Sequence, residues 1–409
     1  MTLLAALIVA AIVLSGLFEV YLSYRHVASV SANQDEVPEG FAGAVSGEEH
    51  RRAAAYTLAR TRLSIAKTIF DTVLSVVWLT LLLGPLYDLV AHFIAPGMSR
   101  GVAVVVLFAL IERLLHLPFS IFSTFALETK FGFNRATPAM FFLDRIKGLV
   151  LAFVFGVPLL YGFFFLLRVL PDFWWLAGWA GLMALMIAMT VIYPAFIAPL
   201  FNKFEPLPQA PLKTRIEALL AKCGFESKGL YVMDASRRST HGNAYFTGFG
   251  KAKRIVFFDT LLQNHTPDEI LSILAHELGH YKLGHIGQRV AESAILTLLG
   301  FGVLYWAFAS GVTGQFGLPR DPGLVLILIL IALGPVMHVI SPLTSFLSRR
   351  AEYQADGFAK AMAGPEPMIS ALTRLSRDNL STLTPDRLYA LFYYSHPPVP
   401  ARIARLKAV

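Results

Sequence analysis

The sequence predicts a mainly α-helical integral membrane protein with seven transmembrane helices and a smaller polar part. Hydrophobic residues make up 56% of the 409 residues, whereas soluble domains usually hold about 45–50%. The mean hydropathy is +0.59, and seven apolar runs are long enough to cross a bilayer as helices. A polar stretch between the fifth and sixth runs carries short strand-like patterns, which predicts a small β-sheet.

The apolar runs give the order of the predicted spans. The first run is broken only by Ser15, Gly16 and Glu19. Because it has neither a basic segment before it nor a clear small-residue cleavage site, we expect a retained helix. The fifth run ends in a stretch punctuated by Pro194 and Pro199. The predicted spans cover residues 3–21, 69–95, 102–127, 149–170, 173–200, 291–312 and 324–346.

The polar segments between the spans predict the orientation. A long loop over residues 23–67 mixes acidic and basic side chains, and further basic residues follow spans three, five and seven. The opposite loops hold only Arg100, Arg168 and Arg320. By the positive-inside rule, the N-terminus lies outside and the basic segments are cytoplasmic. An odd number of spans then puts the C-terminus in the cytoplasm as well.

The formal net charge of +8 is better explained by membrane topology than by nucleic acid. The basic residues are scattered over several loops and do not form a stripe with aromatic residues. We therefore expect a lipid bilayer as a partner and no nucleic acid. The single cysteine, Cys223, excludes an intrachain disulfide and a cysteine-based metal cluster.

Four segments follow from this topology: 1–200 with spans one to five, 201–289 in the cytoplasm, 290–346 with spans six and seven, and 347–409 in the cytoplasm. In the second segment, residues 211–223 have the apolar spacing of an amphipathic helix. Residues 229–233 and 254–259 have the pattern of short strands, and residues 243–248 that of an edge strand or a turn. Thr266 and Pro267 begin a further helix as its N-cap and first residue.

That helix carries the sequence His-Glu-Leu-Gly-His at residues 276–280. His276 and His280 lie one turn apart on one face, so both imidazoles can bind one ion, with Glu277 beside them. Zinc binds imidazole nitrogen and leaves a position for water, whose proton a neighbouring carboxylate can take during attack on an amide. The motif arises by chance in about one chain in a hundred of this length. It is therefore imperfect evidence of a metal site by itself, and a third ligand must be found elsewhere in the chain.

A longer form of the motif does not supply the third ligand. Metzincins need glycine at position 283 and histidine at position 286, but the chain has Leu283 and Ile286. His285 is one residue short of that position, so we interpret it as a polar contact. Between His280 and Ala351 the sequence has only two carboxylates: Glu292 at the start of span six and Asp321 in an outside loop. Neither is well placed.

Glu352 and Asp356, just after span seven, are better candidates. They share one face of a predicted helix on the same side of the membrane as the histidines. Glu352 can reach the ion, while Asp356 can accept the free N–H of a ligating histidine and fix its tautomer. The alternative is an exposed cytoplasmic helix with solvated charges. The histidine motif on the same side favours the ligand interpretation.

Ionisable residues also lie within the predicted spans. Asp88 and His92 are four residues apart on span two, and Glu112 and His116 are four apart on span three, with Arg113 beside them. Charges at membrane depth are costly and usually face protein or water. Local pairing near a helix end and the lining of a hydrated cavity both fit this spacing, so the roles of these residues stay open.

With these motifs, the chain resembles the type I CAAX prenyl endopeptidases, a family of integral-membrane zinc metalloproteases of the gluzincin kind. The resemblance covers nearly the whole chain, including the seven spans, and no metal position departs from the family pattern. It rests on P-L-F-N-K-F at 199–204, S-T-H-G-N-A-Y-F-T-G at 239–248, H-E-L-G-H at 276–280, S-R-R-A-E-Y-Q-A-D at 348–356 and S-H-P-P-V-P-A-R-I at 395–403.

The resemblance implies a role for each matching residue. His276, His280 and Glu352 would bind one zinc ion per chain. Glu277 would be the general base, and Asp356 would support a ligating histidine. The seven helices would enclose a large chamber, and the cytoplasmic part would be a zincin-type domain with a small β-sheet.

The resemblance also implies two residues that hold the substrate backbone and stabilise the oxyanion, Asn243 and His396. From the residues alone, His396 before two prolines would be a turn histidine, and the family match reverses that preference. The edge-strand pattern around Asn243 suggests that substrate is captured by strand addition, with Ala244 and Tyr245 as further contacts.

The leading functional hypothesis is a membrane zinc metalloendopeptidase that removes the last three residues after a prenylated cysteine. The substrate would be a peptide or protein, with or without a prenyl group. A broad-specificity quality-control endopeptidase of membrane proteins would use the same metal site. A non-enzymatic seven-span transporter or receptor, with an accidental motif, is the third hypothesis and predicts no bound zinc.

Overall fold

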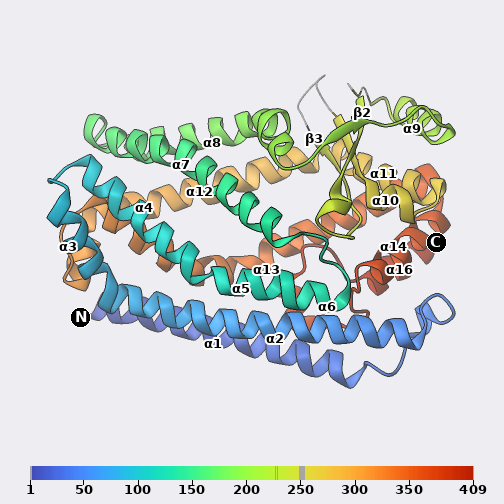
Figure 1. Ribbon diagram of the computed structural model, residues 1–409, viewed down its shortest axis with the longest axis horizontal. Coiled ribbons are helices and arrows are strands. Elements are labelled where there is room, and N and C mark those ends of the chain that lie inside the picture. The colour runs from blue at the N-terminus through green and yellow to red at the C-terminus, as the bar shows by residue number, and fades with distance from the viewer. Residues whose placement is uncertain (1, 226, 228, 248–253, 409) are drawn as a thin grey trace.

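The computed structural model describes residues 2–225, 227, 229–247 and 254–408 (Figure 1). Long helices run side by side along most of its length, and a small sheet with shorter helices lies at one end. We call the end with the sheet, where the expected metal motif lies, the catalytic end, and the long-helix part the membrane part. The mainly α architecture with a small β-sheet is therefore as the sequence predicts.

Within the described residues, six helical stretches are long and apolar enough to cross a membrane. They are α1 (Leu3–Ala32), α2 through α3 (Gly47–Phe93), α7 (Pro138–Val169), α8 with its extension (Trp174–Leu200), α12 (His285–Ser310) and α13 (Pro322–Ala363). A bent pair, α4 (Met98–Leu115) and the helical stretch Leu117–Phe131, makes a seventh span if its 42° bend lies within one crossing. Pro118 at the start of the second helix accounts for the break.

The prediction of a long polar loop over residues 23–67 is wrong. α1 continues to Ala32, and α2 already begins at Gly47. A capping box starts α2: the Ser46 hydroxyl accepts from the Glu49 backbone N–H, and the Glu49 carboxylate accepts from the Ser46 N–H. A helix that extends from the bilayer into water can carry charged side chains, so a high content of charge does not by itself indicate a loop.

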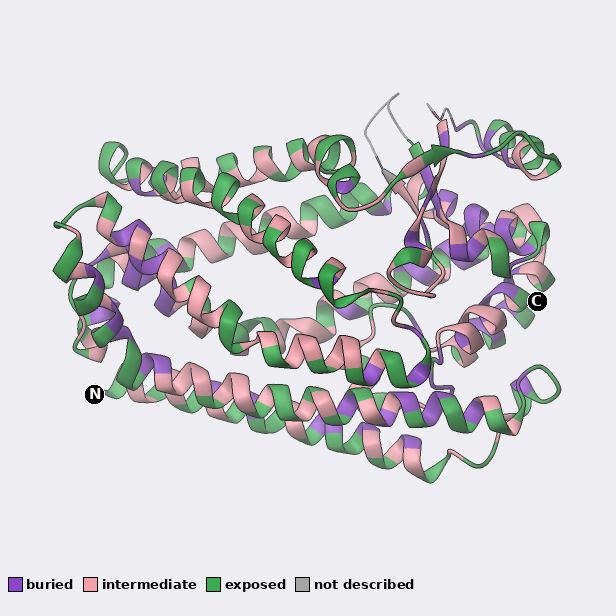
Figure 2. Cartoon of the chain, viewed as in Figure 1, coloured by how far each residue is buried: buried purple, intermediate pink, exposed green. Residues whose placement is uncertain are grey.

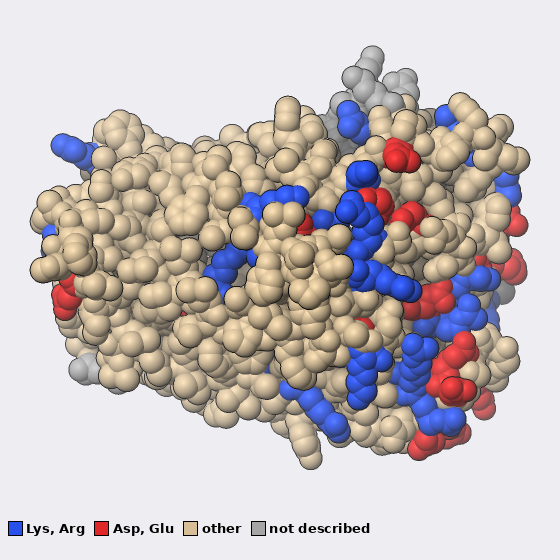
Figure 3. Space-filling model, in the orientation of Figure 1, with Lys and Arg blue, Asp and Glu red and all other residues tan. Residues whose placement is uncertain are grey.

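Burial differs between the two parts of the molecule. In the most apolar windows of α7 and α8, only 6% and 0% of the residues are buried, and Figure 2 shows both helices mostly exposed or intermediate. Apolar side chains on these exposed faces suit lipid. On the face drawn in Figure 3, charged side chains gather over the catalytic end and are sparse over the long helices. This distribution is typical of a protein embedded in a bilayer.

The sheet has four described strands in the order β1-β2-β4-β3. β2 and β4 are parallel, and the two outer pairs are antiparallel. The strands are β1 (Phe204–Pro206), β2 (Gly229–Met233), β3 (Ala244–Thr247) and β4 (Arg254–Phe258). The predictions for β2, β3 and β4 are confirmed to within one residue, although Gly248 lies outside the described residues. β1 was not predicted. β3 is an edge strand.

The metal-motif helix, α11 (Pro267–Lys282), packs against this sheet. Phe257 of β4 and Ile270, Leu274 and Leu278 of α11 form one buried cluster. A capping box between Thr266 and Glu269 begins the helix, as expected from Thr266 and Pro267. The predicted amphipathic helix is α9 (Pro211–Lys222), which packs on the same cluster and ends one residue earlier than predicted.

Three further helices complete the catalytic end: α14 (Pro365–Asp378), α15 (Arg387–Tyr393) and α16 (Val399–Lys407). α14 is tied to the start of α11, because the buried Glu269 carboxylate accepts hydrogen bonds from Ser370 and Arg374. α13 is continuous from the last predicted span into this end. One helix therefore carries both membrane-spanning residues and Glu352.

Candidate metal centre and active site

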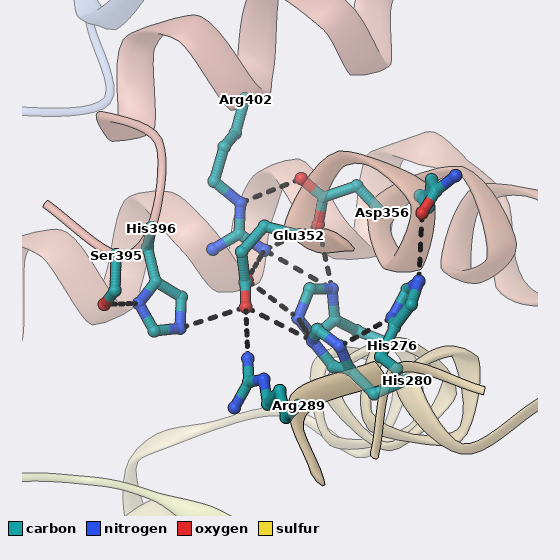
Figure 4. Close-up of polar contacts among 10 residues, drawn as sticks. His276, His280, Arg289, Glu352, Asp356, Ser395, His396 and Arg402 are labelled. Atoms are coloured by element: carbon teal, nitrogen blue, oxygen red, sulfur yellow. Dashed lines mark hydrogen bonds and ion pairs between the residues drawn. The ribbon is translucent and has the colours of Figure 1, made fainter. Parts of the chain in front are cut away.

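Two histidines from α11 face one carboxylate from α13 (Figure 4). The Nε2 atoms of His276 and His280 each lie 3.3 Å from an oxygen of Glu352. The same two nitrogens lie 3.2 Å from each other. One ligand atom from each residue therefore falls within 4.8 Å of the other two, and the structure brings together the three ligands expected from the sequence.

This group of atoms fits a metal ion. The Glu352 side chain is only 1% exposed, and neither of its oxygens has a hydrogen-bond partner within the described part of the chain. The two imidazoles lie close enough to interact with these oxygens, and a cation held among the three residues would compensate the buried negative charge more completely. Two imidazole nitrogens and one carboxylate oxygen form a donor set typical of catalytic metal sites.

A close contact between two helices positions Glu352. A Cβ atom added at Gly279 would lie 3.1 Å from both the Ala355 Cα and the Phe358 Cβ on α13. Only a residue without a side chain allows this approach without a shift of α11 or α13. Gly279 thus lets the two helices that carry the expected ligands pack closely enough for Glu352 to reach the histidines.

Asp356 and Arg402 orient the first histidine. Asp356 Oδ1 lies 2.9 Å from His276 Nδ1, so the ring can donate its N–H to this carboxylate and turn Nε2 toward Glu352. Arg402 of α16 donates to both oxygens of Asp356, over 2.8 Å from Nε and 2.5 Å from Nη2. Both partners are buried, so the ion pair is shielded from water.

The same neighbours change the protonation of His276. Burial alone would lower the pKa of the imidazole, but the Asp356 and Glu352 carboxylates outweigh burial and raise this pKa to about 8 in the metal-free protein. Burial would also lower the pKa of Arg402, but Asp356 raises it above its usual range. The arginine therefore stays charged at every physiological pH.

Glu277 lies beside the ligands, half-buried on α11. Burial raises the pKa of its carboxyl above the ordinary range, the two histidine rings oppose this shift, and Glu352 reinforces it. A carboxyl group with a raised pKa accepts a proton more readily than an ordinary carboxyl group does. This property suits the general base expected from the motif.

The second histidine has its own supporting contacts. His285 Nδ1 lies 3.0 Å from His280 Nδ1, and His285 Nε2 lies 3.0 Å from Gln354 Oε1 on α13. His285 is therefore a polar contact of a proposed ligand, which is the interpretation that the residue spacing favoured.

Of the two expected substrate-binding residues, only His396 lies next to the metal group. His396, between α15 and α16, lies with Nε2 3.3 Å from Glu352 Oε1, and its side chain is 61% exposed. Asn243 is exposed and directly precedes β3, where its carbonyl accepts from the Phe258 N–H. No contact joins Asn243 to the metal group in the described residues. Ala244 is buried in the sheet, and Tyr245 packs on Phe258.

Two arginines near the site were missed in the sequence. Arg402 is the arginine of the motif at 395–403, but no spacing rule pairs it with Asp356 forty-six residues away. Arg289, near the start of α12, has Nη2 4.0 Å from Glu352 Oε1. Because Arg289 lies one helical turn after His285, the sequence could have suggested that Arg289 is near the metal group, but not that Glu352 is its partner.

Ionisable residues of the membrane part pair across helices. His116 Nε2 lies 2.7 Å from Asp71 Oδ1 on α2, and His116 Nδ1 lies 3.5 Å from Glu112 Oε2. Glu112 also accepts from the indole of Trp78. The spacing of Glu112 and His116 therefore does produce a local contact, and Asp71 extends it to a neighbouring helix.

Comparisons with known proteins cover nearly the whole chain. The profile described as "CAAX prenyl protease N-terminal, five membrane helices" matches residues 26–203, and that of "Peptidase family M48" matches residues 206–409. The CAAX prenyl protease 1 homolog of Oryza sativa subsp. japonica is 35% identical, over 97% of this chain and 95% of its own length.

Two yeast proteins extend the comparison. CAAX prenyl protease 1 of Saccharomyces cerevisiae is 33% identical, over 96% of this chain and 92% of its own. The crystal structure of S. mikatae Ste24p superposes with a TM-score of 0.93 and 31% identity, and each chain covers 100% of the other.

Proposed function

Since the chain belongs to the CAAX prenyl protease family of M48 peptidases, we propose that it cleaves the last three residues after a prenylated cysteine with the help of zinc. The protein is a membrane-embedded metalloendopeptidase with the chambered, mainly α fold of this family. The hypothesis of a non-enzymatic transporter or receptor is thereby set aside. The observation that carries the proposal is the convergence of His276, His280 and Glu352.

In this proposal, His276, His280 and Glu352 hold one zinc ion. The donor set suits zinc, and the two oxygens of Glu352 face the two imidazoles. When bound, zinc polarises a peptide carbonyl and makes a water molecule more acidic. Asp356 keeps the His276 ring in the tautomer that leaves Nε2 free for the ion, because its carboxylate accepts a hydrogen bond from the Nδ1–H.

Glu277 moves the proton. It takes one proton from the attacking water as the water oxygen bonds to the peptide carbonyl carbon. It then gives this proton to the amide nitrogen as the C–N bond breaks, so that the amine leaves neutral. The raised pKa of the Glu277 carboxyl suits both steps.

His396 and Asn243 bind the reacting peptide. The imidazole of His396 lies next to the metal group, where a ring N–H can stabilise negative charge on the carbonyl oxygen. The exposed Asn243 lies at the start of the free edge of β3, where an extended peptide can add a strand by main-chain hydrogen bonds. Ala244 and Tyr245 would then be the strand residues that it pairs with.

The catalytic end is proposed to lie in the cytoplasm and the N-terminus outside. The basic segments counted in the sequence are on the side of the sheet, and Figure 3 shows most of the charge on that end. Cytoplasmic cleavage suits a prenylated substrate, whose lipid can enter the bilayer beside the spans.

A broad-specificity endopeptidase acting on damaged membrane proteins is the second candidate. The free β3 edge favours it, because main-chain pairing tolerates varied side chains. Both functions use the same metal group, so the substrate distinguishes them.

Three substrates test the proposal with purified protein: a farnesylated C-terminal peptide, its unprenylated twin and an unfolded membrane protein. We expect the farnesylated peptide to be cut after the cysteine at the highest rate, with one zinc per chain by elemental analysis. Equal cleavage of the twin peptides would contradict the lipid requirement. The control is Glu277→Gln, which should keep zinc and lose cleavage, because all three ligands remain and only the proton carrier is removed.

A further inference from the structure

We propose that Arg60 binds the C-terminal carboxylate of the substrate, in a polar pocket that begins at His396. This inference rests on the proposed function, because only cleavage near a free C-terminus places a carboxylate within reach of the site. It adds a subsite for the three residues that leave, and it assigns a role to a residue of the long helix α2.

The pocket connects the metal group to α2. It has a volume of about 470 Å³ and is lined by α2, by residues 379–382 after α14, and by residues 393–399 around His396. His396 is shared, since its ring also lies 3.3 Å from Glu352. Three extended residues span at most about 10 Å, so a tripeptide beginning at the metal group can extend into a pocket of this size.

Arg60 supplies the only full charge of the pocket lining. The other described lining residues include no Lys, Asp or Glu, and tyrosine, serine and threonine hydroxyls are frequent among them. Arg60 is exposed, and its guanidinium contacts the Tyr56 side chain and interacts electrostatically with Glu128. A guanidinium can donate two parallel hydrogen bonds to a carboxylate. The charge of Arg60 therefore matches the one group that every free C-terminus carries.

A buried tyrosine lies beneath Arg60. Its guanidinium lies over the ring of Tyr56, 5.4 Å from the ring centre. Tyr56 is buried, and its hydroxyl donates to Glu128 over 2.8 Å. Glu128 in turn lies 3.7 Å from His241 Nε2. Because Tyr56 and His241 are the direct partners of Glu128, this carboxylate acts on Arg60 only from a distance, and the exposed guanidinium can still bind a ligand.

These contacts also connect the pocket to the edge strand. His241, two residues before Asn243, has Nδ1 2.8 Å from the side chain of Asn379, which lines the pocket. A peptide that adds to β3 in the more common antiparallel sense would have its C-terminal end on the Asn243 side. The C-terminal residues would then leave the strand toward the pocket and Arg60.

The test measures whether the response to amidation of the substrate depends on Arg60. Two farnesylated peptides are compared, identical except that one ends in a carboxylate and the other in a carboxamide. For the unchanged protein we expect amidation to lower kcat/KM by about tenfold to a hundredfold, mainly through KM, as for the loss of a charged hydrogen-bond pair. For Arg60→Gln, both peptides should be cleaved with the same, reduced kcat/KM.

Two variants serve as controls. Arg62→Gln removes an exposed charge two residues away that does not line the pocket, so it should keep the full effect of amidation. Arg60→Lys keeps the charge but loses the paired donors, so it should show an intermediate effect. Removal of Arg60 breaks no described ion pair, so these variants should fold, which the melting temperature checks.

The outcomes separate the inference from the proposed function. If the unchanged protein cleaves both peptides equally, or if Arg60→Gln still discriminates between them, the role of Arg60 is wrong while cleavage after the cysteine still stands. If the zinc-loaded protein cleaves neither farnesylated peptide but degrades unfolded protein, the proposed function fails, and the inference fails with it.

Discussion

At one end α13 touches its neighbours through backbone and apolar side chains, and at the other end through buried charges. Near its start, Gly323 packs so closely on the Gly101 carbonyl of α4 that a Cβ would not fit, and Leu324 and Ile327 are fully buried in an apolar cluster. Beyond residue 346, the same helix buries Glu352 and Asp356, whose side chains are 1% and 3% exposed.

The difference lies in how each contact tolerates change. Apolar burial is shared among many neighbours, so the loss of one contact is partly compensated by the rest. A buried charge depends on particular partners, and the removal of one partner leaves the other charge unpaired at a cost of about 3–5 kcal/mol. We therefore expect changes near residues 322–346 to affect folding alone and changes near residues 352–356 to affect metal binding and catalysis.

The largest expected effect is that of Glu352→Gln. The substitution removes the only carboxylate among the three proposed ligands, so zinc content should fall from one per chain to well under one half. Cleavage should drop by at least about a thousandfold, since a metal ion contributes several kcal/mol to transition-state stabilisation. Elemental analysis and peptide cleavage measure the two quantities.

The matched change on the same helix is Leu330→Ala. Leu330 is 52% exposed in the membrane part, so zinc content and cleavage should stay within about twofold of the unchanged protein. A comparable loss of zinc in both variants would mean that the two ends of α13 do not differ as argued.

The next effect is that of Asp356→Asn. The amide keeps the shape of the carboxylate but loses the charge that pairs with Arg402 and orients His276, so zinc affinity should fall by about tenfold to a hundredfold. Arg402→Met should lower the melting temperature because it leaves Asp356 with one partner fewer. The double variant with Asp356→Asn and Arg402→Met should lose less melting temperature than the sum of the losses of the two single variants. Strict additivity would show that the pair is not coupled.

The local parts of the site could be predicted from the sequence. Thr266 and Glu269 cap α11 through contacts three residues apart, and the i, i+4 spacing puts Glu352 and Asp356 on one face. Short-range geometry fixes such features, so the residues alone suffice. Their meeting with α11, in contrast, depends on the space left at Gly279, which no residue spacing expresses.

The errors come from long-range contacts and from charge. β1 has only three residues, including Pro206, and it exists because it pairs with β2. The charged stretch 23–67 was assigned to a loop although α1 and α2 pass through much of it, because helices that leave a bilayer carry charge without ending. Arg402 was missed because its partner is distant in the sequence.

A smaller effect concerns pH. In the metal-free protein the pKa of His276 is raised to about 8, and zinc must displace the proton from that ring. Zinc affinity should therefore rise by about tenfold per pH unit up to pH 8 and level off above it. In Asp356→Asn, one of the carboxylates that raise this pKa is gone, so the affinity should level off at a lower pH. Titration with a zinc indicator measures both curves, and a flat curve between pH 6 and pH 8 would contradict this account.

The smallest expected effect tests the comparison most directly, because the same substitution is made in both regions. Gly279→Ala must move α11 from α13 by a few tenths of an ångström, which draws the histidines from Glu352 and should weaken zinc binding severalfold. Gly323→Ala must disturb the contact with Gly101, which should lower the melting temperature while the folded protein keeps its zinc. Gly357→Ala, with no atom near the added methyl group, should keep its zinc and should not lower the melting temperature, because alanine favours a helix interior over glycine. If Gly323→Ala releases zinc as readily as Gly279→Ala does, then packing in the membrane part also holds the metal site together, and the two ends of α13 act as one unit.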